Sequence, residues 1–334
     1  MTTTISRRTL IAALGGMPAA SLLPRVAHAA YPDRPILLIV PFSAGGNADI
    51  VGRLIGHEIG AGVKQTVVIE NRAGAGGGVG ARAVAKAEPD GYTLLVGSNG
   101  PLTINPLVQA SPGYDPAVDF APVALTSYVP HALILSGSVP AKSVAELVEF
   151  SRKSPLNIAT SGVGSATHMT LERFKAASGA QVTHVPYRGG GPLMPDVISG
   201  TIQGAMTEFS TALEMHAGGK ARIAATAAAK RSALAPDIPT FIEQGVKDFV
   251  AQSYVGILAP AKTPAAIIDQ LQAAIAAGLK GGTTPERLRQ LGSEIATAEQ
   301  MTPQGFAAFI KTDAENMREA AKLASEPPRV TAWK

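Results

Sequence analysis

The stretch that decides the fold is Ile36–Asp49, which reads ILLIVPFSAGGNAD. Its first five residues, Ile36–Val40, are all apolar, a pattern typical of a strand whose two faces are both covered by helices. Glycine and small polar residues follow, as expected of a tight turn. Apolar residues then recur at helical spacing on one face, at Ile50, Val51, Leu54, Ile55 and Ile59. The segment therefore predicts a strand, a turn and a helix, in that order.

The same unit recurs along the chain, because further short apolar runs alternate with helical patterns. These runs are Thr66–Ile69, Tyr92–Val96, Ala132–Leu135, Leu156–Ala159, Val182–Val185, Ile202–Met206, Ile223–Thr226 and Val255–Leu258. Strands that alternate with helices predict an α/β fold with mostly parallel sheets.

The tail from Thr263 differs from the rest of the chain, since it holds three helical patterns and no predicted strand. Thr263, Thr284 and Thr302 each precede a proline. A threonine hydroxyl can cap a helix, and proline is tolerated at the first helical position because its missing N–H has no partner there. We therefore expect three helices that begin at these threonines and pack back onto an earlier domain.

The length of 334 residues suggests two domains, at about 150 residues each. Because the tail packs back onto an earlier domain, we expect a first lobe made of two pieces, 30–127 and 253–334. The second lobe, 128–252, is expected to be continuous. The chain would then cross between the lobes twice.

Composition and charge narrow the class of protein. Apolar residues make up 46% of the chain, enough for a packed core, and the absence of cysteine excludes disulfides, thiolate zinc sites and a cysteine nucleophile. The net charge is +4, but three of the 29 basic residues lie in residues 1–30, where there is no acid. The rest of the chain carries 26 basic and 25 acidic side chains, so it lacks the positive field that binds nucleic acid.

Residues 1–29 have the features of a cleaved export signal. Arg7 and Arg8 precede a weakly apolar stretch, Thr9–Leu23, and Ala27–Ala29 offers a small-residue cleavage site. The paired arginines favour the twin-arginine route over the general one. The apolar stretch is too short for a membrane anchor. We therefore expect an exported protein whose mature chain begins near residue 30.

Glycine-rich turns follow five of the predicted strands. They are Pro41–Asp49, Asn71–Gly78, Gly97–Gly100, Thr160–His168 and Pro186–Pro192. Such turns expose backbone N–H groups at helix starts, which bind anions, and ligands of open α/β sheets bind at the carboxyl ends of strands. The alternative is that the glycines only permit tight turns. Five turns that also carry serine, threonine and asparagine predict a cleft for a small anion.

Motifs for catalysis, metals and nucleotides are weak. Gly76–Ala81 fits the dinucleotide pattern G-x-G-x-x-G/A, but the acids downstream precede the next strand and do not end it. Ser161 and Ser165 lie near His168 without the G-x-S-x-G pattern of a hydrolase. No two histidines have H-x-x-x-H spacing. We expect no catalytic residue, no metal and no cofactor.

Several segments, in one fixed order, carry a family resemblance. They are Arg34–Asp49, Asn71–Gly80, Pro89–Leu95, Asp119–Val123, His184–Pro192 and Pro239–Gly245. Together they resemble the substrate-binding receptors of tripartite tricarboxylate transporters, often called the Bug family. The resemblance implies a two-lobed periplasmic-binding-protein fold of type II, with two doubly wound sheets joined by a hinge of two crossings. It also implies a periplasmic monomer that delivers a small organic carboxylate to a small and a large membrane permease subunit.

The resemblance further implies which residues contact the ligand. They are Phe42, Ala44, Gly45, Gly46, Asn47, Ser98 and Asn99 from the first lobe, and Ser161, Gly164, Ser165, Thr167, His168, Tyr187, Arg188, Gly190 and Glu208 from the second. This chain departs from the family pattern at Ala44, usually proline, at Glu208, usually aspartate or asparagine, and at Tyr254, often tryptophan. Arg188 is often lysine in the family. It is expected to pair either with a second ligand carboxylate or with an acid such as Glu208.

Two other functions remain open from the sequence. A ligand-sensing receptor for a two-component kinase would share the fold and the cleft. An exported hydrolase would need a nucleophile, a base and an orienting acid in contact. The transport receptor is our first expectation, the sensor the second and the hydrolase a distant third.

Overall fold

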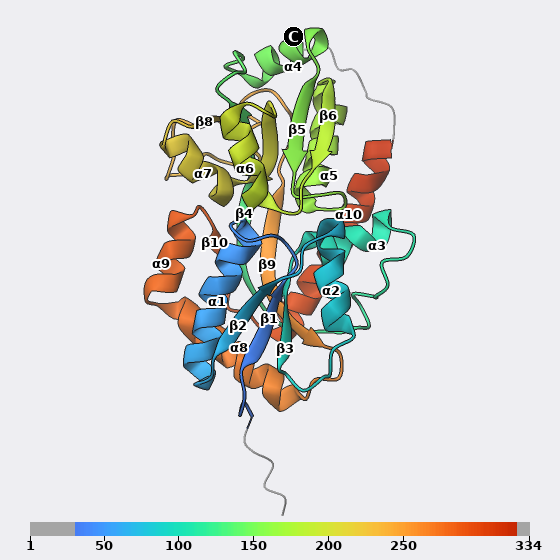
Figure 1. Cartoon of the computed structure of the whole chain (residues 1–334), viewed down its shortest axis with the longest axis vertical. Helices are drawn as coiled ribbons and strands as arrows, with labels where there is room; N and C mark the ends of the chain where they lie inside the picture. Colours follow the sequence, from blue (N-terminus) through green and yellow to red (C-terminus); the bar gives the residue numbers. More distant parts are fainter. Residues whose placement is uncertain (1–30, 326–334) are drawn as a thin grey trace, which may run out of the picture. The chain divides into compact units, whose positions relative to one another are not determined.

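The structure is a computed structural model that describes residues 31–325. The predicted export signal, residues 1–29, lies outside the described residues. In the described part, helices and short strands alternate along most of the chain (Figure 1). No helix in this part is long and apolar enough to cross a membrane.

The predicted apolar runs all lie on strands, with ends that differ by at most three residues except in β4. The strands are β1 (Ile36–Val40), β2 (Val67–Asn71), β3 (Thr93–Gly97), β4 (Phe120–Ser136), β5 (Leu156–Thr160), β6 (Val182–Pro186), β7 (Gly204–Glu208), β8 (Ala221–Thr226), β9 (Gln252–Pro260) and β10 (Glu294–Ile295). The helices are α1 (Asn47–Val63), α2 (Gly78–Ala85), α3 (Asn105–Val108), α4 (Val144–Lys153), α5 (Ala166–Ser178), α6 (Gly190–Ser199), α7 (Phe209–Ala217), α8 (Ala265–Lys280), α9 (Thr283–Gln290) and α10 (Pro303–Ser325), with the short turns η1 (Ala75–Gly77) and η2 (Gly100–Ile104).

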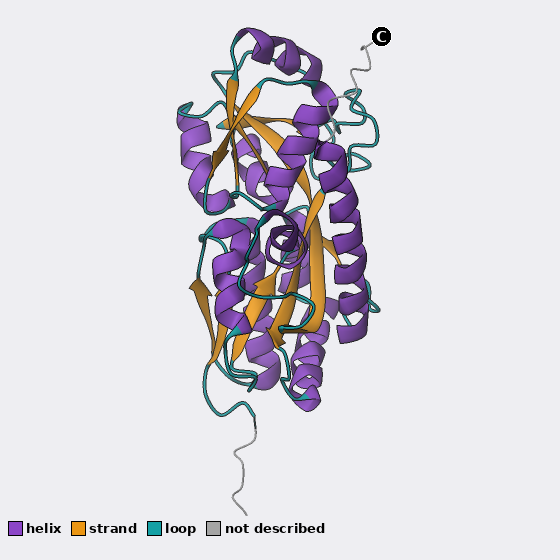
Figure 2. Ribbon diagram, turned by 90° about the vertical axis from the view of Figure 1, so that its right-hand side faces the viewer, coloured by secondary structure: helices purple, strands orange, loops and turns teal. Residues whose placement is uncertain are grey.

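The strands form one sheet in the order β2-β1-β3-β9-β4-β7-β5-β6, and β8 and β10 also pair with β4. β1 pairs in parallel with β2 and β3, and β5 pairs in parallel with β6 and β7. β4 joins these groups, because Phe120–Pro130 pairs with β9 and His131–Leu135 pairs with β7. Helices lie along both sides of the strands (Figure 2). The predicted α/β class is confirmed, with the two predicted sheets sharing β4.

The division into lobes, 30–127 plus 253–334 and 128–252, stays a prediction. β4 runs across the proposed boundary at 127/128, and β9 runs across the one at 252/253. Within the described residues, the chain from Pro32 to Ser325 forms one compact unit.

The segment that opens the chain folds as its pattern predicts. Four of the five residues of β1 are fully buried, and α1 begins at Asn47, directly after Gly46. The face of α1 that carries Val51, Ile55 and Ile59 is fully buried. Packing of α1 therefore fixes the turn between β1 and α1 at the carboxyl end of β1.

β4 is longer than the predicted run Ala132–Leu135, because it begins at Phe120. Pro122 and Pro130 interrupt the apolar pattern in this part of the sequence. Proline cannot donate to the ladder of a sheet. A shift in the pairing register with β9 directly after Pro122 lets the strand continue past it.

The tail contains the three predicted helices, α8, α9 and α10, but the prediction that it holds no strand is wrong. β10 pairs antiparallel with Ser127 and Tyr128 of β4. A strand of two residues is too short to give a periodic pattern, and its pairing with a distant strand supplies the backbone partners that the sequence does not reveal.

One of the three predicted threonine caps forms. The Thr302 hydroxyl accepts a hydrogen bond from the Gly305 N–H at 3.0 Å at the start of α10. The other two predictions are wrong, because α8 begins at Ala265 and α9 at Thr283. The Thr263 hydroxyl donates to the Pro260 carbonyl at 2.7 Å, and the Thr284 hydroxyl donates to Glu58 Oε1 at 2.5 Å. A local carbonyl three residues earlier thus takes the Thr263 hydroxyl, and a distant carboxylate takes the Thr284 hydroxyl, so neither caps its helix.

Candidate functional site

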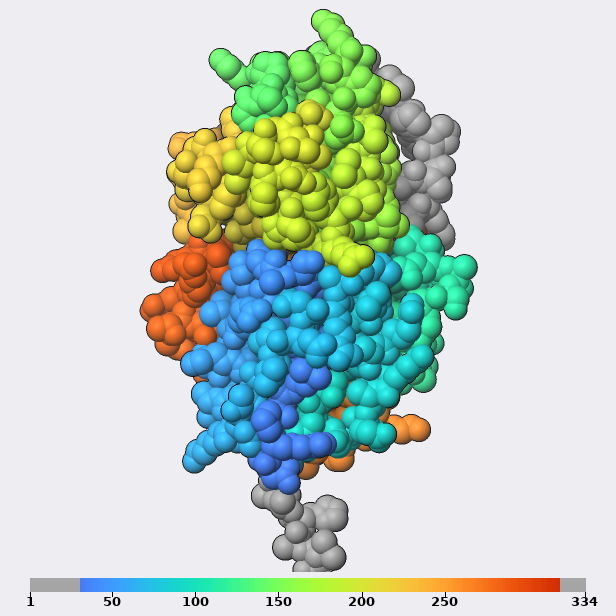
Figure 3. Space-filling view, viewed as in Figure 1, coloured from blue at the N-terminus to red at the C-terminus, as the bar shows by residue number. Residues whose placement is uncertain are grey.

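A cavity lies where the turns after β1, β3, β5 and β6 meet. Its volume in this conformation is about 20 Å³, roughly the space of one water molecule. Its lining residues are Phe42, Gly46, Asn47, Ala48, Ser98, Ser161, Ser165, Ala166, Gly190, Glu208, Ser253, Tyr254 and Val255. The blue N-terminal segment and the yellow-green segment lie directly against each other on the face shown in Figure 3. The cavity is therefore bounded by segments from both predicted lobes.

Four helices begin at this cavity. α1 begins at Asn47, α5 at Ala166 and α6 at Gly190, and each of these residues lines the cavity. α7 begins directly after Glu208, which also lines it. The first turn of a helix presents free N–H groups and the positive end of the helix dipole. An anion in the cavity could therefore receive hydrogen bonds without a cationic side chain.

Asp49 holds the turn between β1 and α1 in place. Its carboxylate accepts hydrogen bonds from the Gly45 N–H at 3.0 Å, from Asn71 Nδ2 at 2.9 Å and from both Nε and Nη2 of Arg53. Burial acts to raise the pKa of Asp49, but the hydrogen bonds from Arg53, Gly45 and Asn71 outweigh it and lower that pKa. Asn71 Nδ2 also donates to the Phe42 carbonyl at 2.9 Å. The Asp49 carboxylate thus stabilises the turn through these hydrogen bonds, and it does not line the cavity.

The turns of the two predicted lobes are joined by hydrogen bonds. The Ser43 N–H donates to the Arg188 carbonyl at 2.9 Å. The Ser210 hydroxyl donates to Asn47 Oδ1 at 3.0 Å, and both groups are buried. These contacts close the cavity on the side of the β1–α1 turn.

Glycine is required where these turns approach each other most closely. A Cβ atom on Gly191 would lie 2.1 Å from the Ala44 carbonyl oxygen. A Cβ atom on Gly76 would lie 2.6 Å from the Val163 carbonyl oxygen and equally close to the Gly164 carbonyl carbon. The glycines therefore do more than permit tight turns, since they let the two sets of turns touch backbone to backbone.

Half of the residues predicted to contact the ligand line the cavity. They are Phe42, Gly46, Asn47, Ser98, Ser161, Ser165, Gly190 and Glu208. The other predicted residues do not line the cavity, although each lies within three residues of a lining residue along the chain; they are Ala44, Gly45, Asn99, Gly164, Thr167, His168, Tyr187 and Arg188.

Hydrogen bonds explain why several of these side chains face elsewhere. Asn99 Nδ2 donates to the Asp313 carboxylate at 3.2 Å, and Asn99 Oδ1 accepts from the Tyr254 N–H at 3.2 Å. The Thr167 hydroxyl accepts from the Ser161 N–H at 3.0 Å, so it shapes the turn after β5. The Tyr187 hydroxyl donates to Asp196.

His168 stacks on His184, with ring centroids 4.3 Å apart. Its Nδ1 accepts from the Gly164 N–H at 3.3 Å, while His184 Nε2 lies 2.7 Å from the Thr160 hydroxyl. Burial lowers the pKa of His168, and burial together with the neighbouring His168 lowers the pKa of His184 to about 4. Both rings are therefore neutral at pH 7 and stabilise the turn after β5.

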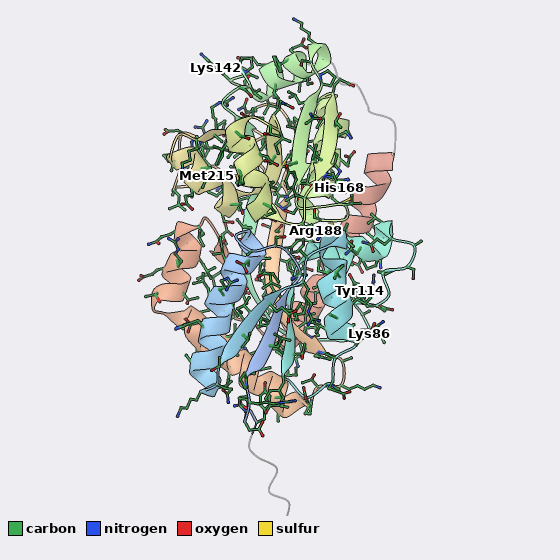
Figure 4. All side chains as sticks on the ribbon, in the orientation of Figure 1. Lys86, Tyr114, Lys142, His168, Arg188 and Met215 are labelled. Atoms are coloured by element: carbon green, nitrogen blue, oxygen red, sulfur yellow. The ribbon has the colours of Figure 1, made fainter. Side chains whose placement is uncertain are left out.

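The Arg188 side chain is exposed and does not line the cavity. Figure 4 shows it at the junction between the elements around β5 and those around β1. Among the described residues, no ion pair joins Arg188 to Glu208, so that predicted pairing is not formed.

The cavity lining contains buried hydroxyls without a hydrogen-bond partner and one carboxylate. The hydroxyls of Ser161 and Tyr254 are buried and have no hydrogen-bond partner, which is uncommon for polar groups inside a protein. The half-buried Glu208 carboxylate accepts from the hydroxyls of Ser253 at 3.2 Å and Thr207 at 3.3 Å. Burial raises the pKa of Glu208 in spite of these hydrogen bonds.

The sequence analysis missed five lining residues, Ala48, Ala166, Ser253, Tyr254 and Val255. Ala48 and Ala166 are the residues next to predicted ones, so the helix starts themselves could have indicated them. Ser253 lies on β9, which carries no glycine-rich turn, and only the pairing of β9 with β4 brings it to the cavity. Within residues 31–325, no group of three or more His, Asp and Glu side chains is placed to hold a metal ion.

Comparisons with known proteins identify the family to which the chain belongs. The model of the TctC family, described as the tripartite tricarboxylate transporter family receptor, matches residues 51–322. The chain is 32% identical to the protein BugT of Bordetella pertussis over 281 residues, which cover 83% of this chain and 86% of BugT.

Two solved structures are similar over most of this chain. R. palustris Rpa4515 with adipate has 33% identity and a TM-score of 0.84, and the match covers 88% of this chain and 98% of that chain. MatC from Rhodopseudomonas palustris with bound malate has 31% identity and a TM-score of 0.83, with 87% and 99% covered. The predicted periplasmic-binding-protein fold and the predicted family are thereby confirmed. The chain belongs to the TctC family of tripartite tricarboxylate transporter receptors, periplasmic solute-binding proteins that include BugT.

Proposed function

We propose that this protein is a periplasmic receptor that binds a small organic carboxylate in the cavity and delivers it to a small and a large membrane permease subunit. One observation carries the proposal: four helix N-termini meet at one cavity, where the Ser161 hydroxyl has no partner. Family membership supports delivery to a permease. The adipate and malate in the two similar structures support a carboxylate ligand.

Hydrogen bonds from the donors at this cavity are strong enough to bind such a ligand. A hydrogen bond to a charged group contributes about 1.5–3 kcal/mol. Micromolar affinity requires about 8 kcal/mol. A few N–H and hydroxyl donors from the helix starts, together with buried ligand surface, would reach this value after the cost of ordering the ligand.

Closure of the two predicted lobes is part of the proposal. The lining residues belong to both lobes, so a ligand would contact all of them only when the lobes are together. A ligand stabilises the conformation to which it binds more tightly. β4 and β9, the two segments that cross between the predicted lobes, would act as the hinge.

Isothermal titration calorimetry with a panel of carboxylates tests the proposal. We expect at least one mono- or dicarboxylate to bind with micromolar affinity or better, and deletion of the gene to abolish uptake of that compound by cells. Failure of every carboxylate to bind would contradict the proposal. Binding with unchanged uptake in the deletion strain would favour a sensor over a transport receptor.

Ser161→Ala should weaken ligand binding without weakening the fold. The hydroxyl has no partner in the protein, so its removal breaks no internal hydrogen bond and relieves a buried unpaired group. If the hydroxyl binds the ligand carboxylate, its loss should weaken affinity about 10- to 100-fold, because a hydrogen bond to a charged group contributes about 1.5–3 kcal/mol. Calorimetry and thermal unfolding measure the two quantities.

Thr226→Val is the matched control for this substitution. Thr226 also carries a buried hydroxyl without a partner, but it lies on β8 and does not line the cavity. Thr226→Val should leave the affinity for the ligand unchanged, and it should preserve or raise the melting temperature. If Ser161→Ala and the wild type bind the ligand with equal affinity, the Ser161 hydroxyl does not contribute to ligand binding.

A further inference from the structure

Glu208 is the one charged side chain among the residues that line the cavity. It is the last residue of β7, and α7 begins at the next residue. Within the described residues, both of its carboxylate oxygens are held by hydroxyls, from Ser253 and Thr207, and not by lysine or arginine. The cavity therefore combines four helix N-termini with one negative side chain that lacks a counter-charge.

A buried chain of hydrogen bonds ends at this carboxylate. The Thr170 hydroxyl lies 2.7 Å from His131 Nδ1, His131 Nε2 lies 2.8 Å from the Ser253 hydroxyl, and Ser253 donates to Glu208. His131, Ser253 and Thr170 are all less than 5% exposed. Burial, with a contribution from the Arg173 charge, lowers the pKa of His131 to about 3, so its ring is neutral.

A neutral ring has one N–H donor and one acceptor nitrogen, which fixes the direction of the chain. Because the Ser253 hydroxyl gives its only proton to Glu208, it must accept from His131 Nε2–H. His131 Nδ1 is then the acceptor for the Thr170 hydroxyl. Every donor in the chain points toward Glu208, and these hydrogen bonds favour the ionised carboxylate against the burial that raises its pKa.

These hydroxyls do not neutralise the charge. An ion taken out of water without a counter-ion is costly, and that cost is repaid when an opposite charge with good geometry joins it. No lining residue can supply this charge, since the cavity is lined by no lysine, arginine or histidine. The missing positive charge can therefore come from the ligand.

We propose that Glu208 determines ligand specificity and that the cavity selects zwitterions, carboxylates that also carry a protonated amino group. This inference rests on the proposed function. The ligand carboxylate would lie at the N-termini of α1, α5 and α6, and its ammonium group would donate to Glu208. The closed site would then hold one added positive and one added negative charge.

Other ligand classes fit this charge arrangement less well. A dicarboxylate would place a second negative charge in the same cavity as Glu208, and like charges at close range repel strongly when water is excluded. A hydroxy acid could donate to Glu208 but would leave its charge unpaired. The proposal thus separates this chain from the similar structures that hold adipate and malate.

Calorimetry with a matched series of acids tests the proposal. For each chain length from three to six carbons, the series comprises the unsubstituted acid, its 2-hydroxy and terminal hydroxy forms, its 2-amino and terminal amino forms, and the dicarboxylate. We expect one amino form to bind at least tenfold more tightly than its hydroxy partner and than the dicarboxylate. Glu208→Gln should remove this preference and tighten dicarboxylate binding. Glu172→Gln, whose side chain pairs with Lys175 outside the cavity, should leave the preference unchanged.

The outcomes separate this proposal from the proposed function. If a dicarboxylate or hydroxy acid binds most tightly to the wild type, the zwitterion proposal is overturned while the carboxylate receptor stands. If no member of the series binds, the zwitterion proposal fails, and the carboxylate receptor fails only if the full carboxylate panel also shows no binding. If the amino form is preferred equally by the wild type and by Glu208→Gln, zwitterion binding stands but Glu208 is not its cause. The wild-type series alone decides the preference, should Glu208→Gln fold poorly.

Discussion

Replacing Gly191 with alanine should weaken carboxylate binding by about 10- to 100-fold while the protein remains folded. The added methyl group would lie 2.1 Å from the Ala44 carbonyl oxygen, so the turns after β1 and β6 would have to separate. Overpacking of this kind costs about 1–3 kcal/mol. Under the proposed mechanism the strain falls on the closed state alone, because an open hinge moves the two turns apart. Affinity is reduced in proportion to the population that can close.

Two further glycines give this prediction its controls. A Cβ atom on Gly46 would lie 3.1 Å from the Gly190 nitrogen, a milder conflict, so Gly46→Ala should weaken binding less than Gly191→Ala. A Cβ atom on Gly137 would meet nothing within 4 Å, so Gly137→Ala should leave affinity unchanged. Calorimetry measures the affinities, and small-angle X-ray scattering measures whether ligand still compacts the protein. If Gly191→Ala binds and compacts like the wild type, backbone contact between these turns is not required for closure.

The fold could be predicted where structure is set by neighbours in sequence. Ile36–Asp49 is an example, because its apolar run, glycine pair and helical pattern are adjacent and each has its own signal. The first part of β4 was missed for the opposite reason. Prolines break its pattern, and its stability comes from pairing with β9, which lies more than a hundred residues away. β10 depends on β4 in the same way.

The candidate site was predictable to the extent that it is made of turns and helix starts. Gly46, Ser165 and Gly190 lie at such positions, and all three line the cavity. Side-chain direction could not be predicted, since it depends on tertiary partners. Asn99 faces Asp313 of α10, a residue 214 positions later in the chain. Ser253 reaches the cavity only because β9 runs beside β4, and so the contact of Ser253 with Glu208 had no signal in the sequence.

Acid should destabilise the protein well above the pH at which His131 itself becomes protonated. The pKa of His131 falls from its ordinary value of 6.5 to about 3 in the folded protein, because the ring is buried. Between these values the unfolded chain takes up a proton that the folded chain does not. The contribution of the neutral His131 ring to the free energy of unfolding is therefore complete above pH 6.5, and it is lost progressively as the pH falls toward 3. At 1.36 kcal/mol for each unit of pKa, the loss from His131 is about 3 kcal/mol at pH 4.

Two acids act in the opposite direction, because burial raises the pKa of both Glu208 and Asp313 and so favours the folded state as the pH falls. His131→Gln separates the two effects: it removes the titrating ring but keeps a polar group that can reach the Ser253 hydroxyl. This variant should be less stable than the wild type at pH 7.5, yet should lose less stability on acidification to pH 4.5. Urea unfolding at both values measures the difference. His57→Gln is the control, because the His57 side chain is 74% exposed and its removal should leave the pH dependence unchanged. If wild type and His131→Gln lose equal free energy of unfolding, the buried ring is not what limits stability in acid.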